Sequence, residues 1–158
     1  MSTMFQRHLT NAIQYARLTH LLICGATLEL ASVEACSKDH QHMHSINATF
    51  AYRVDVKSVL KAVRGAHALD RALLAHAELC LQAVVATYDL LDFEYRLGLC
   101  GTDTAAALNK RLAGTGITIR SFKISSFSMD AATMKYRDRE LLRPPEMSRD
   151  EWTILDRT

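Results

Sequence analysis

Three histidines alternate along one short polar segment, and their side chains are the first candidates for chemistry. His40, His42 and His44 stand in the segment SKDHQHMHS, directly before a stretch with a strand-like pattern. Alternate residues of an extended chain point the same way, which is how a strand presents imidazoles to a metal ion. Their even numbering continues the apolar side of the following strand, and Cys36 or Asp39 would complete a site. A small metal-binding module is therefore one hypothesis, although the spacing matches no zinc signature.

A second candidate pair lies in a long helical pattern. The segment Arg71-Ala-Leu-Leu-Ala-His76 resembles the arginine–histidine motif of HEPN-type ribonucleases. The resemblance implies an RNA-cleaving dimer in which histidine does acid/base work and arginine stabilises charge. Helical spacing, however, places His76 beside Leu73 and Cys80, which favours a packed core histidine. The strand-like segments also depart from the all-helical HEPN bundle, so the ribonuclease stays an alternative.

Other sequence signatures of catalysis are absent. The chain has no glycine-rich nucleotide-binding loop, no GxSxG motif and no HExxH motif. For each candidate set of catalytic residues, a structural role is the better explanation. We therefore favour a non-enzymatic role and expect no cofactor.

A row of basic residues suggests an anionic partner. Positive charges near the start of a helix oppose the helix dipole, so they reduce stability slightly unless an anion is bound there. RNA, an acidic lipid surface or an acidic patch on a neighbouring copy would each satisfy the row. We call these residues the basic strip: Arg53, Lys57, Lys61, Arg64 and Arg71.

The element that positions these residues is a long helical pattern from Val54 to Arg96. It is apolar on most of its circumference around residues 69–91, which is typical of a helix surrounded by other elements. Its length predicts a break near Gly65 or near Asp89. The GLCGTD sequence is expected to end it, before a shorter helix over residues 105–112.

Strand patterns stand on both sides of this helix. Residues 26–36 alternate and then shift parity, which predicts a strand with a bulge near Ala31 or Ser32. Residues 46–56 alternate strictly and complete a hairpin, and residues 117–129 predict an edge strand or a second bulge. Helices are predicted over 3–23 and 129–142. The fold class is therefore α+β, with a small antiparallel sheet packed on a long central helix and two or three shorter helices.

Length and composition agree with one globular domain. The chain has 158 residues, a formal net charge of +2 and four cysteines without metal-site spacing, which favours reduced thiols in a cytoplasmic compartment or a virion. No run of eighteen apolar residues occurs, so we expect no transmembrane segment. We predict a domain over residues 1–143 and a docking tail over residues 144–158, held through Trp152, Ile154 and Leu155.

Taken together, these features favour a structural or assembly protein. An edge strand, a tail with an aromatic anchor and a charged helix suit self-association, so we expect a homo-oligomer. Small viral or phage structural proteins, of the matrix, neck or tail kind, share this size and mixed architecture, and we expect this class by analogy.

Overall fold

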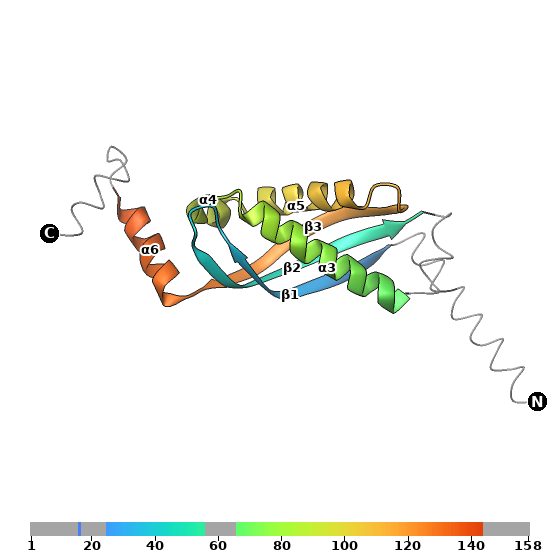
Figure 1. Cartoon of the computed structure of the whole chain (residues 1–158), viewed down its shortest axis with the longest axis horizontal. Coiled ribbons are helices and arrows are strands. Elements are labelled where there is room, and N and C mark those ends of the chain that lie inside the picture. Colours follow the sequence, from blue (N-terminus) through green and yellow to red (C-terminus); the bar gives the residue numbers. More distant parts are fainter. Residues whose placement is uncertain (1–15, 17–24, 56–65, 144–158) are drawn as a thin grey trace, which may run out of the picture.

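The chain folds as a three-stranded sheet covered by helices, which confirms the predicted α+β class (Figure 1). The computed structural model describes residues 25–55 and 66–143, together with Ala16. In chain order the elements are β1 (Ala26–Cys36), β2 (His42–Val54), α3 (Ala66–Val85), α4 (Leu90–Tyr95), α5 (Leu97–Arg111), β3 (Ile117–Met129) and α6 (Ala131–Leu142).

The sheet is antiparallel, with β2 between β1 and β3. The predicted hairpin of β1 and β2 is confirmed, and so is the bulge in β1. The register shifts between Leu30 and Val33, and Ser32 adopts a positive φ of 56°. The extra residue moves the buried positions of β1 from even to odd numbers, which explains the parity change in its sequence.

Strand β3 is an edge strand and also carries bulges, as its sequence predicts. Ala51 of β2 pairs with Ser121 of β3, but the next residue, Tyr52, pairs with Ile119. The register therefore shifts by one residue at this point. A second shift separates the partners of Asn47 and Ala48. Because each shift changes which residues face inward, Ile119, Phe122 and Ile124 all reach the core despite their mixed spacing.

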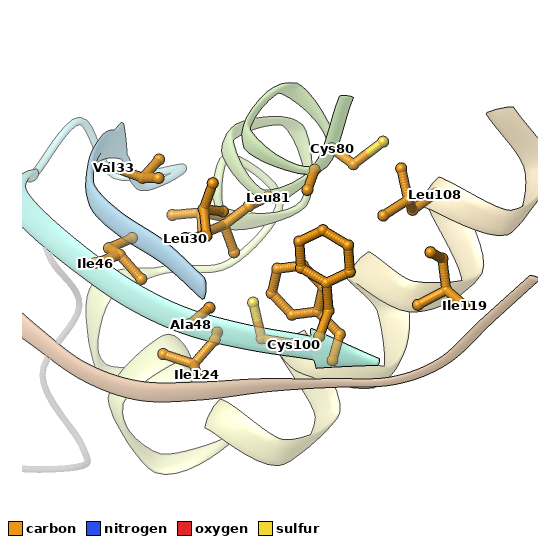
Figure 2. Close-up of a cluster of buried hydrophobic side chains, with 14 of the residues drawn as sticks. Leu30, Val33, Ile46, Ala48, Cys80, Leu81, Cys100, Leu108, Ile119 and Ile124 are labelled. Carbon is orange, nitrogen blue, oxygen red and sulfur yellow. The ribbon is translucent and has the colours of Figure 1, made fainter. Parts of the chain in front are cut away.

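Helices α3 and α5 lie over one face of this sheet (Figure 1). Burial along β2 is strictly alternating from Ile46 to Val54, as its sequence predicts. Figure 2 shows the resulting core, in which side chains from the strands meet those of α3 and α5. The rings of Phe50 and Phe122 stack within it, with centroids 5.6 Å apart and planes inclined by 6°.

The helical region differs from its prediction at the C-terminal end of the central pattern. Val54 closes β2, which agrees with the strand predicted over residues 46–56. The break expected near Asp89 is confirmed, because α3 ends at Val85 and Asp89 precedes α4. The GLCGTD sequence was expected to end a helix, and this prediction is wrong. It lies inside α5, where Gly101 is buried against β3. Packing on the sheet thus outweighs the low helix propensity of glycine.

Several predictions concern residues outside the described part of the chain. They are the helix over residues 3–23, the segment with Gly65, and the tail over residues 144–158 with Trp152, Ile154 and Leu155. Among the helices of residues 66–143, none is long and apolar enough to cross a membrane.

The close approach of α5 to β3 gives a direct stability test. A Cβ atom on Gly101 would lie 2.5 Å from the carbonyl oxygen of Phe122, so Gly101→Ala must force the helix away from the strand. Such overpacking costs about 1–3 kcal/mol. We expect thermal unfolding, followed by circular dichroism, to occur about 5 °C lower.

Gly98 provides the matched control within the same helix. No atom lies within 4 Å of a Cβ placed on Gly98, so Gly98→Ala should leave stability unchanged or raise it by about 0.5–1 kcal/mol. Equal melting temperatures for the two variants would contradict the packing described for α5.

Candidate functional site

The three candidate histidines do not lie as the sequence predicts. His40 occupies the turn between β1 and β2 with a positive φ of 62°, and His42 and His44 are exposed on β2. Met43, between them, is 1% exposed. The register shift between Met43 and Ser45 reverses the parity of the strand, so these histidines do not continue its apolar face. Within residues 25–55 and 66–143, no group of three or more histidine, cysteine or acidic side chains is arranged to hold a metal.

His76 is not the core histidine that helical spacing suggested. It is partly exposed on α3, and its Nδ1 atom accepts a hydrogen bond of 3.0 Å from Nε of Arg111 on α5. Arg71 is exposed on a different side of α3. The contact that the structure gives His76 therefore joins two helices.

The cysteines of the core are also structural. Burial raises the pKa of Cys80, and it raises the pKa of Cys100 to about 11. Both thiols therefore stay protonated at neutral pH, where a thiol is a poor nucleophile. Cys36 is partly buried and, like these two, is not in a disulfide.

A cavity of about 380 Å³ lies between α4, α6 and the turn after β1. Its acidic side chains have partners within the chain. Asp89 lies 3.8 Å from Nζ of Lys38, and Glu140 lies 3.3 Å from Nη1 of Arg143. No local pattern in the sequence indicates this cavity, because its walls come from three separate segments: Asp39, Asp89, Leu91, Asp92, Tyr95, Tyr136, Glu140 and Arg143.

Asp39 is the structural centre of this region. Its Oδ1 atom accepts hydrogen bonds from the hydroxyl of Ser37 and, at 3.1 Å, from the backbone N–H of Leu90. The carboxylate thus joins the turn after β1 to the first residue of α4. The backbone N–H of Lys38 adds a bond of 2.8 Å to the carbonyl of Tyr88. The cavity is therefore bounded by contacts that hold the fold together.

The basic strip is only partly described. Arg53 is exposed near the end of β2, and Arg71 is exposed near the start of α3. The hydroxyl of Tyr52 donates a 3.0 Å hydrogen bond to Asp70, which brings these two ends together. Burial and this bond raise the pKa of Tyr52. Lys57, Lys61 and Arg64 lie outside the described residues.

Several exposed positions on the outward side of α3 carry apolar residues. Its inward side holds Leu73, Ala77 and Leu81, and its flanks bond to β1 through Gln82 and to α5 through His76. Solvent-facing positions of such a helix are normally polar. Here four exposed apolar residues recur at steps of three or four and form what we call the outer row: Ala72, Ala75, Leu79 and Ala83. Leu79 is 50% exposed.

The family of the chain follows from comparison with known proteins. The model of the SPFH domain / Band 7 family matches residues 20–140, which include every described strand and nearly all of the described helices. The chain belongs to this family. SPFH proteins are membrane-associated scaffolds of the stomatin, prohibitin and flotillin type, and they typically assemble into oligomers. No curated protein matches the chain.

SPFH membership corrects the functions expected from the sequence. The viral or phage structural protein is wrong, because this is a family of cellular membrane scaffolds. SPFH membership also contradicts the HEPN-like ribonuclease and the metal-binding module, and binding of RNA has no support. The expectation of a self-associating structural protein fits in part, because SPFH proteins are scaffolds that typically form oligomers. The sequence misled because size and mixed architecture are shared by unrelated families.

The bond network around Asp39 predicts a selective loss of stability. Asp39→Ala leaves the first N–H of α4 without its acceptor, and we expect a loss of about 1–2 kcal/mol. Lys38→Ala, in the same turn, removes only a solvent-exposed ion pair and should cost less than about 1 kcal/mol. Urea unfolding of both variants measures the difference. A loss for Lys38→Ala as large as that for Asp39→Ala would contradict this role.

Proposed function

We propose that this SPFH domain is a self-associating scaffold module that works at a membrane surface. The observation that carries the proposal is the apolar outer row of α3 in a chain of this family. A helix that is apolar both inside and outside is typical of an element covered on both sides. Within the described residues, the sheet and α5 cover the inner side and one flank. A second copy of the chain is the partner that covers the outer row in this proposal.

The basic strip supports binding to an anionic membrane surface. Arg53 and Arg71 lie at one end of the fold, where the Tyr52–Asp70 hydrogen bond joins β2 to α3. Lys57, Lys61 and Arg64 fall between them in the sequence. A cluster of this size near an anionic lipid surface gains about 1 kcal/mol per basic residue. An acidic lipid surface thus replaces RNA as the anionic partner that we propose.

The compartment forms part of the same proposal. Cys80 and Cys100 are buried and unpaired, and Cys36 is partly buried and unpaired. Reduced thiols are the rule in the cytosol and nucleus. We therefore propose that the module faces a reducing compartment such as the cytoplasm.

Self-association is tested by reversing the character of the outer row. Leu79→Asp places a charge where the second copy would pack, and we expect the dissociation constant of the oligomer to rise about 30-fold or more. Light scattering over a dilution series measures the mass. Because the Leu79 side chain is half exposed, the melting temperature of the separated chains should change little.

Leu142→Asp is the matched control, because Leu142 is 77% exposed and lies on α6. This variant should keep the mass of the unchanged protein. A chain that is monomeric at every concentration, or a Leu79→Asp variant with unchanged mass, would refute assembly through α3.

Membrane binding is tested with vesicles of phosphatidylserine and phosphatidylcholine. Replacing both Arg53 and Arg71 by glutamine removes two charges, and we expect the partition into acidic vesicles to fall about 25-fold. Co-sedimentation at low and physiological salt measures the partition. Binding should also weaken as salt rises, because the charges are exposed.

Lys135→Gln together with Lys110→Gln is the control for total charge. Both lysines are exposed, and neither belongs to the basic strip. This double variant should bind acidic vesicles like the unchanged protein. An equal loss in both double variants would show that net charge alone decides, and binding to pure phosphatidylcholine at the same level would contradict an anionic partner.

A further inference from the structure

The sheet has one covered face and one open face. On the middle strand β2, the buried residues from Ile46 to Val54 alternate with residues that point away from α3 and α5. Side chains on this second side are exposed or partly exposed, because the described helices pack on the other side (Figure 1). We call the second side the open face, and its residues on β2 and β3 are Asn47, Thr49, Ala51, Arg53, Thr118, Arg120, Ser121, Lys123 and Ser126.

Three basic residues gather toward one end of the open face. Arg53 pairs across the sheet with Thr118, and Arg120 lies two positions further along β3. A strand spacing of about 4.8 Å and a rise of about 3.3 Å per residue put the Cα atoms of Arg53 and Arg120 about 8 Å apart. Lys123 lies opposite Thr49, and the same spacings put it about 14 Å from Arg53. We call Arg53, Arg120 and Lys123 the basic patch.

A bulge in β3 brings Arg120 onto the open face. Ile119 is buried and pairs with Tyr52, whereas Ser121 pairs with Ala51 on the open face. Arg120 is the extra residue between these two pairs, and it is exposed. Because side chains alternate along a strand, the residue after inward Ile119 points outward. The bulge thus gives β3 two successive outward residues, one of them basic.

The charges of the basic patch have no partner among the described residues. Three other arginines each lie 2.9–3.6 Å from a carboxylate: Arg96, Arg137 and Arg143. By contrast, no member of the basic patch forms an ion pair or a side-chain hydrogen bond with another described residue. Two acidic residues lie nearby, Glu29 on β1 and Asp55 after the end of β2, so positive charge stays in excess. Exposed charges of one sign attract an anion from outside the molecule.

The side chains around the basic patch are short. Thr49, Ala51 and Ser121 lie between its members, and Thr118 lies beside Arg53. Arginine and lysine side chains are longer than these, so the charged groups stand above their neighbours. A flat array of anions can therefore meet all three charged groups at the same time. The cytoplasmic leaflet of a membrane, with its anionic lipids, is such an array.

We propose that the open face of the sheet lies on an anionic lipid surface, with the basic patch against the headgroups. The inference rests on the proposed membrane function and adds an orientation, in which the sheet faces the bilayer and α3 and α5 lie on the far side. Membership of a family of membrane-associated scaffolds supports lipid as the source of the anions. In this orientation the outer row of α3 points away from the membrane and stays available to a second copy.

A double variant on β3 tests the basic patch. Arg120→Gln with Lys123→Gln removes two charges that the basic strip does not contain, and we expect the partition into vesicles of phosphatidylserine and phosphatidylcholine to fall about 25-fold. Lys110→Gln with Lys135→Gln removes as many exposed charges elsewhere and should bind like the unchanged protein. Co-sedimentation measures the partition, and circular dichroism checks folding. An unchanged partition in the folded β3 variant would overturn the proposal.

This result is separable from a failure of the proposed function. If Arg53→Gln with Arg71→Gln weakens binding and the β3 variant does not, the membrane function stands and the orientation is wrong. If the unchanged protein does not bind acidic vesicles, the membrane function fails and the orientation fails with it. A lower mass of the β3 variant in the absence of vesicles would assign the basic patch to contact between copies, and this too would overturn the proposal.

A fluorescent label tests the orientation independently. Ser121→Cys carries a nitrobenzoxadiazole label on the open face, and Ala106→Cys carries it on the exposed side of α5. Both proteins also contain Cys36→Ser, because Cys36 is only partly buried. Acidic vesicles should brighten and blue-shift the emission at residue 121 and leave the emission at residue 106 unchanged. A response at residue 106 equal to or larger than that at residue 121 would overturn the proposal.

Discussion

The burial of one face of β2 beneath two helices is the constraint on which the remainder of the structure depends. Strand β2 is the middle strand, and its inward residues from Ile46 to Val54 are 0–3% exposed. Burying five such side chains contributes several kcal/mol, which is comparable to the whole stability of a typical domain. The edge strands carry bulges opposite the regular part of β2 from Ile46 to Val54, and β2 has a bulge of its own only before this part, between Met43 and Ile46.

The helices reach this face by different means. Helix α3 covers the side of β1, where Gln82 donates a 2.9 Å bond to the carbonyl of Glu34. Helix α5 covers β3, where Gly101 allows the two backbones to approach closely. Arg111 and His76 then join the helices to each other. Polar contacts at the flanks therefore fix the positions of α3 and α5 on the sheet, because hydrophobic contacts alone would allow the helices to slide.

This arrangement leaves part of the helical surface of this SPFH domain outside its core. The sheet needs only the inner sides of α3 and α5, so their outer sides are free to carry another function. On α3 the outer row is apolar, and the exposed side chains of Arg71 and Glu78 lie beside it. On α6, Arg137 pairs with Glu94 of α4 and Tyr136 packs against the core, while Met134, Leu141 and Leu142 are exposed.

Much of the fold could be predicted from the sequence, because local patterns govern it. Alternation in β2 specified its buried face, the parity change in β1 located the bulge at Ser32, and the helical pattern broke near Asp89 as expected. A period of two or of 3.6 residues is a property of the chain itself, so it survives without knowledge of neighbours.

The site was decided by tertiary structure. His42 and His44 turn outward because of a bulge in β2 between Met43 and Ile46, which shifts its register against both β1 and β3. His76 bonds to Arg111, 35 positions further along the chain. The acidic cavity is lined by three separate segments, and the GLCGTD sequence is helical because β3 accepts Gly101 at close range. Such contacts depend on which distant residues meet, and neither spacing nor composition encodes that. The sequence by itself determined the elements and their buried faces, whereas tertiary packing alone decided which side chains remained at the surface.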